Sequence, residues 1–404
     1  MKTKYKLLIF FTSFGYGVVA PVLSLLLSAH GCPTGMLGVA FGAFAAVVIA
    51  AEVPSGVFAD LHGRKVSFLI SCALSAVSGA VLLLARSFPA AVAGLMLFGL
   101  AAAFSSGSAE ALIVDETLLE RGQDALGKTV ASIAAYQCAG IAAGSLLGGY
   151  LPNDGAYTVH LAVRISLALA CAVFAAVVLK ETARGQKKQG GLLKAHLGQM
   201  VRIMKQKRAL TAVFLVIFAV TVTQAMVEMY WQPGLISLSG GVAQSYLGYI
   251  CAGGYVATTL GCALMGRANL KAQRRQWIAY IGLGAAFAVL VYAMAAQTGP
   301  LWFAVCYVLL YFSIGLMAVP EQTIVNTHAT NDVRASVMSV VSFFSRAGAL
   351  ISGVVSSALL LKTQIGPMWQ IGAAFTGVCL LAVGVSVIVS LKKSAASEET
   401  PAEG

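Results

Sequence analysis

The chain has 404 residues, of which 59% are hydrophobic and only 10% are charged. Soluble globular proteins have about a quarter of their residues charged, so this composition excludes an ordinary soluble domain. The formal net charge of +12 does not indicate a nucleic-acid-binding protein, because the basic residues lie between apolar runs in a pattern typical of membrane topology.

Twelve apolar runs of about twenty residues follow one another, and a helix of this length spans the hydrocarbon core of a bilayer. The predicted helices cover residues 7–28, 35–59, 66–86, 89–114, 129–151, 158–179, 209–231, 244–266, 276–296, 300–325, 336–361 and 367–391. With the amino terminus in the cytoplasm, 23 of the 27 Lys and Arg residues fall in cytoplasmic segments, as the positive-inside rule requires. The sequence therefore predicts an all-α polytopic membrane protein with both termini in the cytoplasm.

Residues 180–208 separate two groups of six predicted helices and hold nine Lys and Arg residues. Leucines and methionines recur there at helical spacing, which predicts an amphipathic helix on the inner membrane surface. The predicted division is an N-terminal half at 1–179, a cytoplasmic linker at 180–208, a C-terminal half at 209–391 and a disordered tail at 392–404. Pro89 and Glu110 recur at the same spacing as Pro300 and Glu321, which supports two six-helix pseudo-repeats.

The loop after the second run is the most specific feature of the sequence. Gly56 allows a close helix approach, Asp60 ends the membrane segment, Gly63 permits a tight reversal, and Arg64-Lys65 begin the next helix. The spacing G-x-x-x-D-x-x-G-R-K resembles the loop between helices 2 and 3 of the major facilitator superfamily. The alternative is an ordinary glycine-containing cytoplasmic loop, since such loops are usually basic.

The resemblance implies a transporter that works by alternating access between its two halves. It implies that the loop acts as a conformational switch, with Asp115 at the base of the fourth helix as the partner of Arg64. We expect a monomer in a bacterial-type inner membrane whose partners are the bilayer, a small organic substrate and protons. The eight cysteines are isolated and no nucleotide-binding loop or nucleophile–base pair is visible, so neither an enzyme nor a cofactor or metal is predicted.

Charged residues inside the apolar runs are functional candidates, because a charge in hydrocarbon is costly. Glu110, Glu52 and Glu321 are the proton-coupling candidates. A carboxyl partly removed from water at Glu110 could bind and release a proton as a cavity opens to either side, or Glu110 could simply bond Ser105 or Ser106.

Arg346 is a second intramembrane charge with two interpretations. Glu52, Gly56 and Asp60 are spaced by four and share one helix face, and Arg346 lies at a similar depth in the eleventh run. We predict an ion pair between Glu52 and Arg346. The alternative is that Arg346 points into the cavity and binds an anionic group of the cargo.

His160 and Arg164 lie one turn apart near the outer end of the sixth run. The favoured interpretation is that both extend to the membrane interface. His30 is expected to be solvated in a loop.

The fifth run carries a glycine pattern with two interpretations. Gly140, Gly144, Ser145, Gly148 and Gly149 resemble the helix 5 motif of the drug:proton antiporter branches, with serine in place of the proline. Small residues at this spacing are also a general packing pattern in membranes. Those branches tend to carry an Arg in helix 4, and this chain lacks one there.

The favoured function is proton-coupled export of amphipathic organic compounds, as in multidrug efflux. The substrate-cavity candidates are Tyr16, Tyr136, Gln137, Gln224, Glu228, Tyr307 and Tyr311. One alternative is uptake of a small nutrient by symport or facilitated diffusion, which would need denser hydrogen-bonding groups. The other is a membrane sensor or scaffold that transports nothing.

Overall fold

The computed structural model describes residues 1–122, 125–181, 208–241, 243–268, 270, 272–329 and 334–398. Within these ranges, twelve helical spans are long and apolar enough to cross a membrane, which confirms the predicted all-α polytopic class. The predicted amphipathic helix of the linker lies almost wholly outside the described residues.

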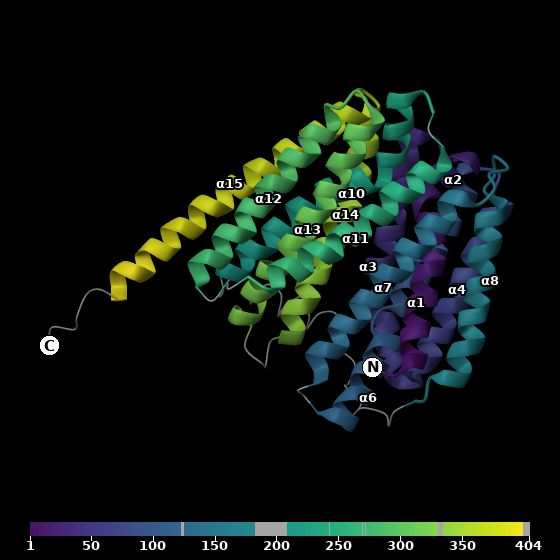
Figure 1. Cartoon of the computed structure of the whole chain (residues 1–404), viewed down its shortest axis with the longest axis horizontal. Helices are drawn as coiled ribbons and strands as arrows, with labels where there is room; N and C mark the ends of the chain where they lie inside the picture. Colours follow the sequence, from purple (N-terminus) through teal and green to yellow (C-terminus); the bar gives the residue numbers. More distant parts are fainter. Residues whose placement is uncertain are drawn as a thin grey trace. The chain divides into compact units, whose positions relative to one another are not determined.

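The helices of the first six spans (Figure 1) are α1 (Thr3–Val19), α2 (Leu23–Ala29), α3 (Leu37–His62), α4 (Arg64–Leu84), α5 (Phe88–Ser105), α6 (Ala109–Arg121), α7 (Leu126–Tyr150) and α8 (Thr158–Val178). The later helices are α10 (Arg208–Ser239), α11 (Gln244–Gly266), α12 (Gln273–Ala295), α13 (Pro300–His328), α14 (Arg334–Leu360) and α15 (Ile365–Glu398). A short 3-10 turn at Ala20–Val22, which contains Pro21, divides the first span, since proline cannot donate the backbone hydrogen bond of a helix interior. α15 continues to Glu398, beyond the end expected at residue 391.

The chain divides into two compact units. The N-terminal unit contains Met1–Leu192, Glu228–Val256 and Ala349–Thr363, and the C-terminal unit contains Leu193–Val227, Ala257–Gly348 and Gln364–Gly404. The segments Glu228–Val256 and Ala349–Thr363 therefore group with the N-terminal unit, whereas the sequence division at 209 assigned them to the C-terminal half.

In the N-terminal unit, α1 packs against α7 and α8 (Figure 1), while α5 packs against α3 and α4. A Cβ on Gly144 would meet the carbonyl oxygen of Phe14, and one on Gly148 would meet that of Val18. Because no side chain separates the backbones at these glycines, α7 lies directly against α1. In the C-terminal unit, α12 packs against α13 and α15.

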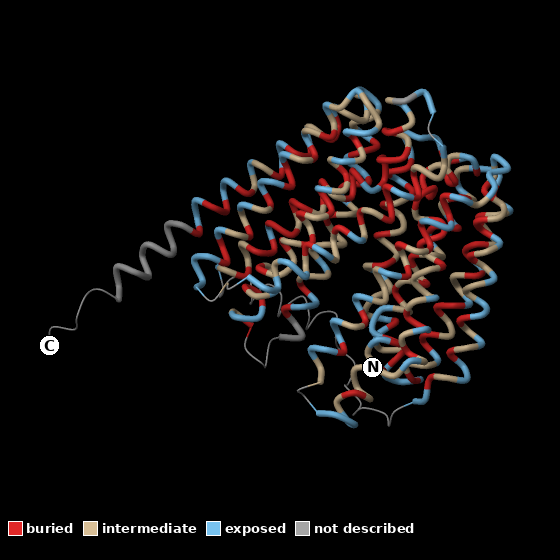
Figure 2. The backbone as a smooth tube through the Cα atoms, viewed as in Figure 1, coloured by how far each residue is buried: buried red, intermediate tan, exposed pale blue. Residues whose placement is uncertain are grey.

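Large apolar side chains remain exposed along single stripes of the peripheral helices. On α8, Leu169, Val173 and Val177 are spaced by four and are all more than half exposed. Figure 2 shows exposed and buried positions alternating along such helices. An exposed apolar stripe is unfavourable in water but suits hydrocarbon, so it marks the lipid-facing side.

Polar contacts tie loop residues together at each of the two ends of the N-terminal unit. At the inner end, which is predicted to face the cytoplasm, the Lys2 ammonium contacts the carboxylates of Glu116 and Glu120, each at 2.6 Å. At the opposite end, the ring nitrogens of His30 lie 3.1 Å from the Ala85 carbonyl oxygen and 2.7 Å from that of Ala156. His30 is 2% exposed, so the expectation that it is solvated is wrong.

Candidate functional site

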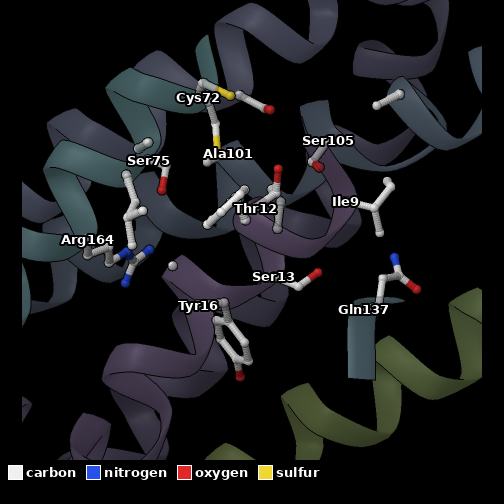
Figure 3. A pocket seen from close by; sticks show the side chains of 18 of the residues that line it. Ile9, Thr12, Ser13, Tyr16, Cys72, Ser75, Ala101, Ser105, Gln137 and Arg164 are labelled. Atoms are coloured by element: carbon white, nitrogen blue, oxygen red, sulfur yellow. The ribbon is translucent and has the colours of Figure 1, made fainter. Parts of the chain in front are cut away.

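A cavity of about 410 Å³ lies among the helices of the N-terminal unit. Side chains of α1, α4, α5, α6, α7 and α8 line it. Most lining groups are apolar or small, and seven of them carry hydroxyls: Thr12, Ser13, Tyr16, Ser71, Ser75, Ser105 and Ser106. Figure 3 shows Arg164 on one side of the cavity and Gln137 on the other, with Thr12 and Ser13 between them.

The fourth span is broken at the cavity. The sequence predicted one helix over residues 89–114, but α5 ends at Ser105 and α6 begins at Ala109. Gly107 has a φ of +69°, a left-handed conformation that glycine adopts without steric cost. Irregular backbone at membrane depth is tolerated where it is buried in protein or lines a cavity, and Ser105 and Ser106 both line this one.

Glu110 is placed by this break. It lies in the first turn of α6, where the positive end of the helix dipole favours a carboxylate, and it lines the cavity. The side-chain amide of Gln137 on α7 donates a hydrogen bond to its Oε1 at 2.5 Å. Its hydrogen-bond partner is therefore Gln137 and not Ser105 or Ser106, which the alternative interpretation had named.

Arg164 points into the cavity, so the prediction that it extends to the interface is wrong. It lies six residues after the start of α8, about 9 Å along the axis, and is 2% exposed. Its guanidinium carbon lies 3.9 Å from the ring centroid of Phe98. Among the described residues, its Nη2 atom has no hydrogen-bond partner.

His160 is also buried rather than at the interface. Its ring is 0% exposed, and its Nε2 atom lies 2.8 Å from the carbonyl oxygen of Gly148 on α7. Both residues face α8's protein neighbours because their side of the helix is opposite the lipid-facing stripe.

The inner end of the unit carries the loop that the sequence singled out. Gly63 has a φ of +105° and joins α3 to α4 in the tight reversal that was predicted. Arg64 Nη1 contacts Asp115 Oδ2 at 2.5 Å, so the ion pair implied by the resemblance is present. Asp60 is exposed, and a Cβ on Gly56 would meet no described atom within 4 Å, so the close helix approach expected there is not seen.

Glu181 is a residue of this loop cluster that the sequence reasoning missed. Its carboxylate accepts hydrogen bonds from the backbone N–H groups of Arg64 at 2.8 Å and Lys65 at 3.0 Å. These are among the N–H groups that a helix start leaves without partners, so Glu181 caps α4 from a distant part of the chain. The available signal was a carboxylate directly after the sixth apolar run.

At the outer end of the N-terminal unit, a second set of contacts joins the start of α3 to residues of α10 and α14. We call this set the outer seal (Gly38, Val39, Tyr230 and Ser357). The N–H of Gly38 donates to the Tyr230 hydroxyl at 2.8 Å, and the N–H of Val39 donates to Ser357 Oγ at 3.1 Å. A Cβ on Gly38 would also meet the backbone oxygen of Gly353. No motif in the sequence pointed to these partners.

The remaining predicted residues are dispersed. Tyr16 and Gln137 line the cavity, whereas Tyr136 packs beside it against the buried core around Ile133. Glu228, in the N-terminal unit, is exposed. Gln224, Tyr307, Tyr311, Glu321 and Arg346 belong to the C-terminal unit.

The structure gives the contact partners of Glu321 and of the small residues in the fifth span. Glu321 accepts a hydrogen bond from the buried Tyr280 hydroxyl at 3.0 Å. In the fifth span, Gly140, Gly144 and Gly148 face α1, Gly149 faces Gly248, and Ser145 Oγ lies 3.4 Å from the Cys251 thiol. Glu52 lies half-buried on α3 in the N-terminal unit, and its pairing with Arg346 stays a prediction.

A ligand-sized cavity among membrane-spanning helices, beside a broken helix, is the arrangement of a membrane transporter. The sequence model of the Major Facilitator Superfamily matches residues 7–353, and the chain belongs to this family. It is therefore a transporter and not an enzyme.

Relatives and solved structures agree with this assignment. The chain is 25% identical over 367 residues to the uncharacterized MFS-type transporter YxaM of Bacillus subtilis (strain 168), covering 89% of each chain. Its fold is similar to the nucleoside transporter NupG, with a TM-score of 0.75 at 16% identity over 95% of this chain and 98% of that one. The human organic anion transporter MFSD10 gives a TM-score of 0.64 at 16% identity over 94% and 98%.

Proposed function

We propose that this protein is a secondary active transporter that works by alternating access and exports amphipathic organic compounds in exchange for protons. The observation that carries the proposal is the cavity, in which the carboxylate of Glu110 stands among apolar side chains and hydroxyls. We place the protein as a monomer in a bacterial-type inner membrane with both termini in the cytoplasm.

Glu110 is the proposed proton carrier. Carboxylates at membrane depth are costly unless they serve a function, and they often mark proton relays. Its hydrogen bond from Gln137 holds the carboxylate at the cavity wall, where water on whichever side is open can deliver or remove a proton. Glu52 and Glu321 are the next candidates if the coupling group lies elsewhere.

The loop cluster at the inner end is the proposed conformational switch. Gly56, Asp60, Gly63, Arg64, Lys65 and Asp115 form it. The Arg64–Asp115 ion pair joins the start of α4 to the middle of α6, and the Glu181 cap joins it to the segment just after α8. Such contacts hold one arrangement of helices, so transport requires that some of them break or shift.

Uptake of a small polar nutrient by proton symport is the second candidate. The seven hydroxyls that line the cavity favour it, because a polar cargo needs closely spaced hydrogen-bonding partners. Few such groups were expected from the sequence.

Purified protein in liposomes with an imposed pH gradient separates the two candidates. An antiporter drives its cargo toward the acidic compartment, whereas a proton symporter drives it toward the alkaline one. We expect compounds of an amphipathic panel to accumulate in acid-loaded vesicles and to release protons from them. Accumulation only in alkaline-loaded vesicles would establish symport and refute the exchange.

Variants of Glu110 test its role. Glu110→Gln should abolish compound-dependent proton flux while compound binding persists, and Glu110→Asp should retain part of the flux. Glu120→Gln is a matched control, because Glu120 lies on the same helix but does not line the cavity. Full proton-driven accumulation in Glu110→Gln would assign coupling to another group.

A further inference from the structure

We infer that Arg164 is the residue that recognises the charge of the cargo, and that the cargo is an organic anion with a planar carboxylate, sulfonate or phosphate group on an apolar body. The inference rests on the proposed transport function and names its substrate class. No sequence motif pointed to it, since Arg164 was expected at the membrane interface.

Arg164 is a buried cation whose charge the surrounding protein does not neutralise. Its side chain is 2% exposed, yet in the described part of the chain no carboxylate forms an ion pair with it. Glu110 shares the cavity but is bonded to Gln137, on the side opposite Arg164 (Figure 3). A buried guanidinium is costly unless it is paired with an anion. An anionic group that enters the cavity can therefore form the ion pair that no described carboxylate forms with Arg164.

The surroundings of Arg164 fix the orientation of its hydrogen-bond donors. The guanidinium lies over the Phe98 ring at 3.9 Å, and the Phe98 ring is itself stacked on Tyr16 at 6.0 Å between centroids. This stack restrains the plane of the guanidinium, and the unpartnered Nη2 is one nitrogen of its planar donor fork. Such a fork matches the two oxygens of a carboxylate or sulfonate, which a lysine ammonium cannot do as well.

The rest of the cavity suits the body of such a molecule. Pockets for organic ligands typically enclose about 300–1,000 Å³, and this cavity of about 410 Å³ falls in that range. Ile141, Leu167 and the Phe98 ring supply apolar surface, while Thr12 and Ser75 supply hydroxyls. An aromatic or aliphatic anion therefore fits, whereas a cationic cargo would meet Arg164 as a like charge.

Ligand binding to the purified full chain in detergent tests the inference without requiring transport. The probes share one ring system: 2-naphthalenesulfonate, 2-naphthoate and 2-naphthyl phosphate as anions, 2-naphthalenesulfonamide as the neutral compound and 2-naphthylmethylammonium as the cation. Isothermal titration should show that the wild type binds at least one anion at least tenfold more tightly than the neutral compound or the cation. A preference for the cation or the neutral compound, or binding of no anion, overturns the inference.

Substitutions locate the effect at Arg164. Arg164→Gln should weaken binding of the preferred anion by about 10- to 100-fold, the usual effect of losing a charge-assisted hydrogen bond, and leave the neutral compound within about twofold. Arg164→Lys should fall between the two. Arg86→Gln is the matched control, since Arg86 is an exposed arginine outside the cavity. Unchanged anion binding in folded Arg164→Gln overturns the inference, and if that variant does not fold, the wild-type preference decides.

The same probes distinguish this inference from the proposed function. Anion binding that depends on Arg164 but drives no proton flux in liposomes would refute proton exchange and leave the inference standing. Proton flux that is driven by the cation and is unaffected by Arg164→Gln would refute the inference and leave the exchange standing.

Discussion

Replacing Tyr230 with phenylalanine should open the outer seal without disturbing its packing. The Tyr230 ring is 0% exposed, and its hydroxyl accepts the hydrogen bond from the N–H of Gly38 at 2.8 Å. Gly38 is the second residue of α3, so its N–H has no partner within the helix. Phenylalanine fills the same space but leaves this donor buried and unsatisfied.

The expected magnitude follows from that donor. An unsatisfied buried donor costs about 1–3 kcal/mol. Because the penalty applies only while the seal is closed, it shifts the equilibrium toward the open state by about 5- to 150-fold.

Cys32 supplies a native reporter of the opening. It is 1% exposed and lies six residues before Gly38, in the connection between α2 and α3. Burial raises the pKa of the Cys32 thiol to about 11, so the closed state holds almost no reactive thiolate at neutral pH. A membrane-impermeant maleimide should therefore label Cys32 only when the seal opens.

The assay compares labelling rates in a background where Cys32 is the single cysteine. We expect Tyr230→Phe to increase the rate by about 5- to 150-fold, in proportion to the open fraction. Tyr292→Phe serves as the control, because Tyr292 is exposed on α12 in the C-terminal unit. An unchanged rate in Tyr230→Phe, with the protein folded, would show that the Gly38–Tyr230 bond does not hold the outer end closed.

Three further substitutions test other parts of the structure. Glu181→Ala should lower transport while membrane abundance is preserved, because it removes a helix cap worth about 1 kcal/mol from the start of α4. Lower abundance with unchanged activity per molecule would show that Glu181 acts in folding only. Gly148→Val should destabilise the protein by about 1–3 kcal/mol through overpacking and so lower its unfolding temperature in detergent. Gly282→Val is the control, because no atom lies within 4 Å of a Cβ added there. Equal unfolding temperatures of the two variants would contradict the tight backbone packing of α7. Exchanging Glu52 and Arg346 should restore the activity lost in each single variant, and a dead exchange beside active single variants would rule out the pair.

The sequence by itself determined the membrane architecture and the backbone reversal between α3 and α4. Run length is a local property of the chain, and a run of about twenty apolar residues has no stable place except across a bilayer. The reversal at Gly63 and the ion pair of Arg64 with Asp115 were also predicted correctly. The reversal depends on a local backbone conformation that favours glycine, whereas the ion pair was implied by the resemblance of the loop to the family.

Only the tertiary structure decided which way each membrane residue faces. Lipid and protein interior are both apolar, so hydropathy does not specify how a helix is rotated about its axis. Arg164 was therefore predicted to extend to the membrane interface, although its side chain lines the cavity. The Glu181 cap and the Tyr230 seal depend on partners that only the packing of distant helices brings to the first N–H groups of α4 and α3.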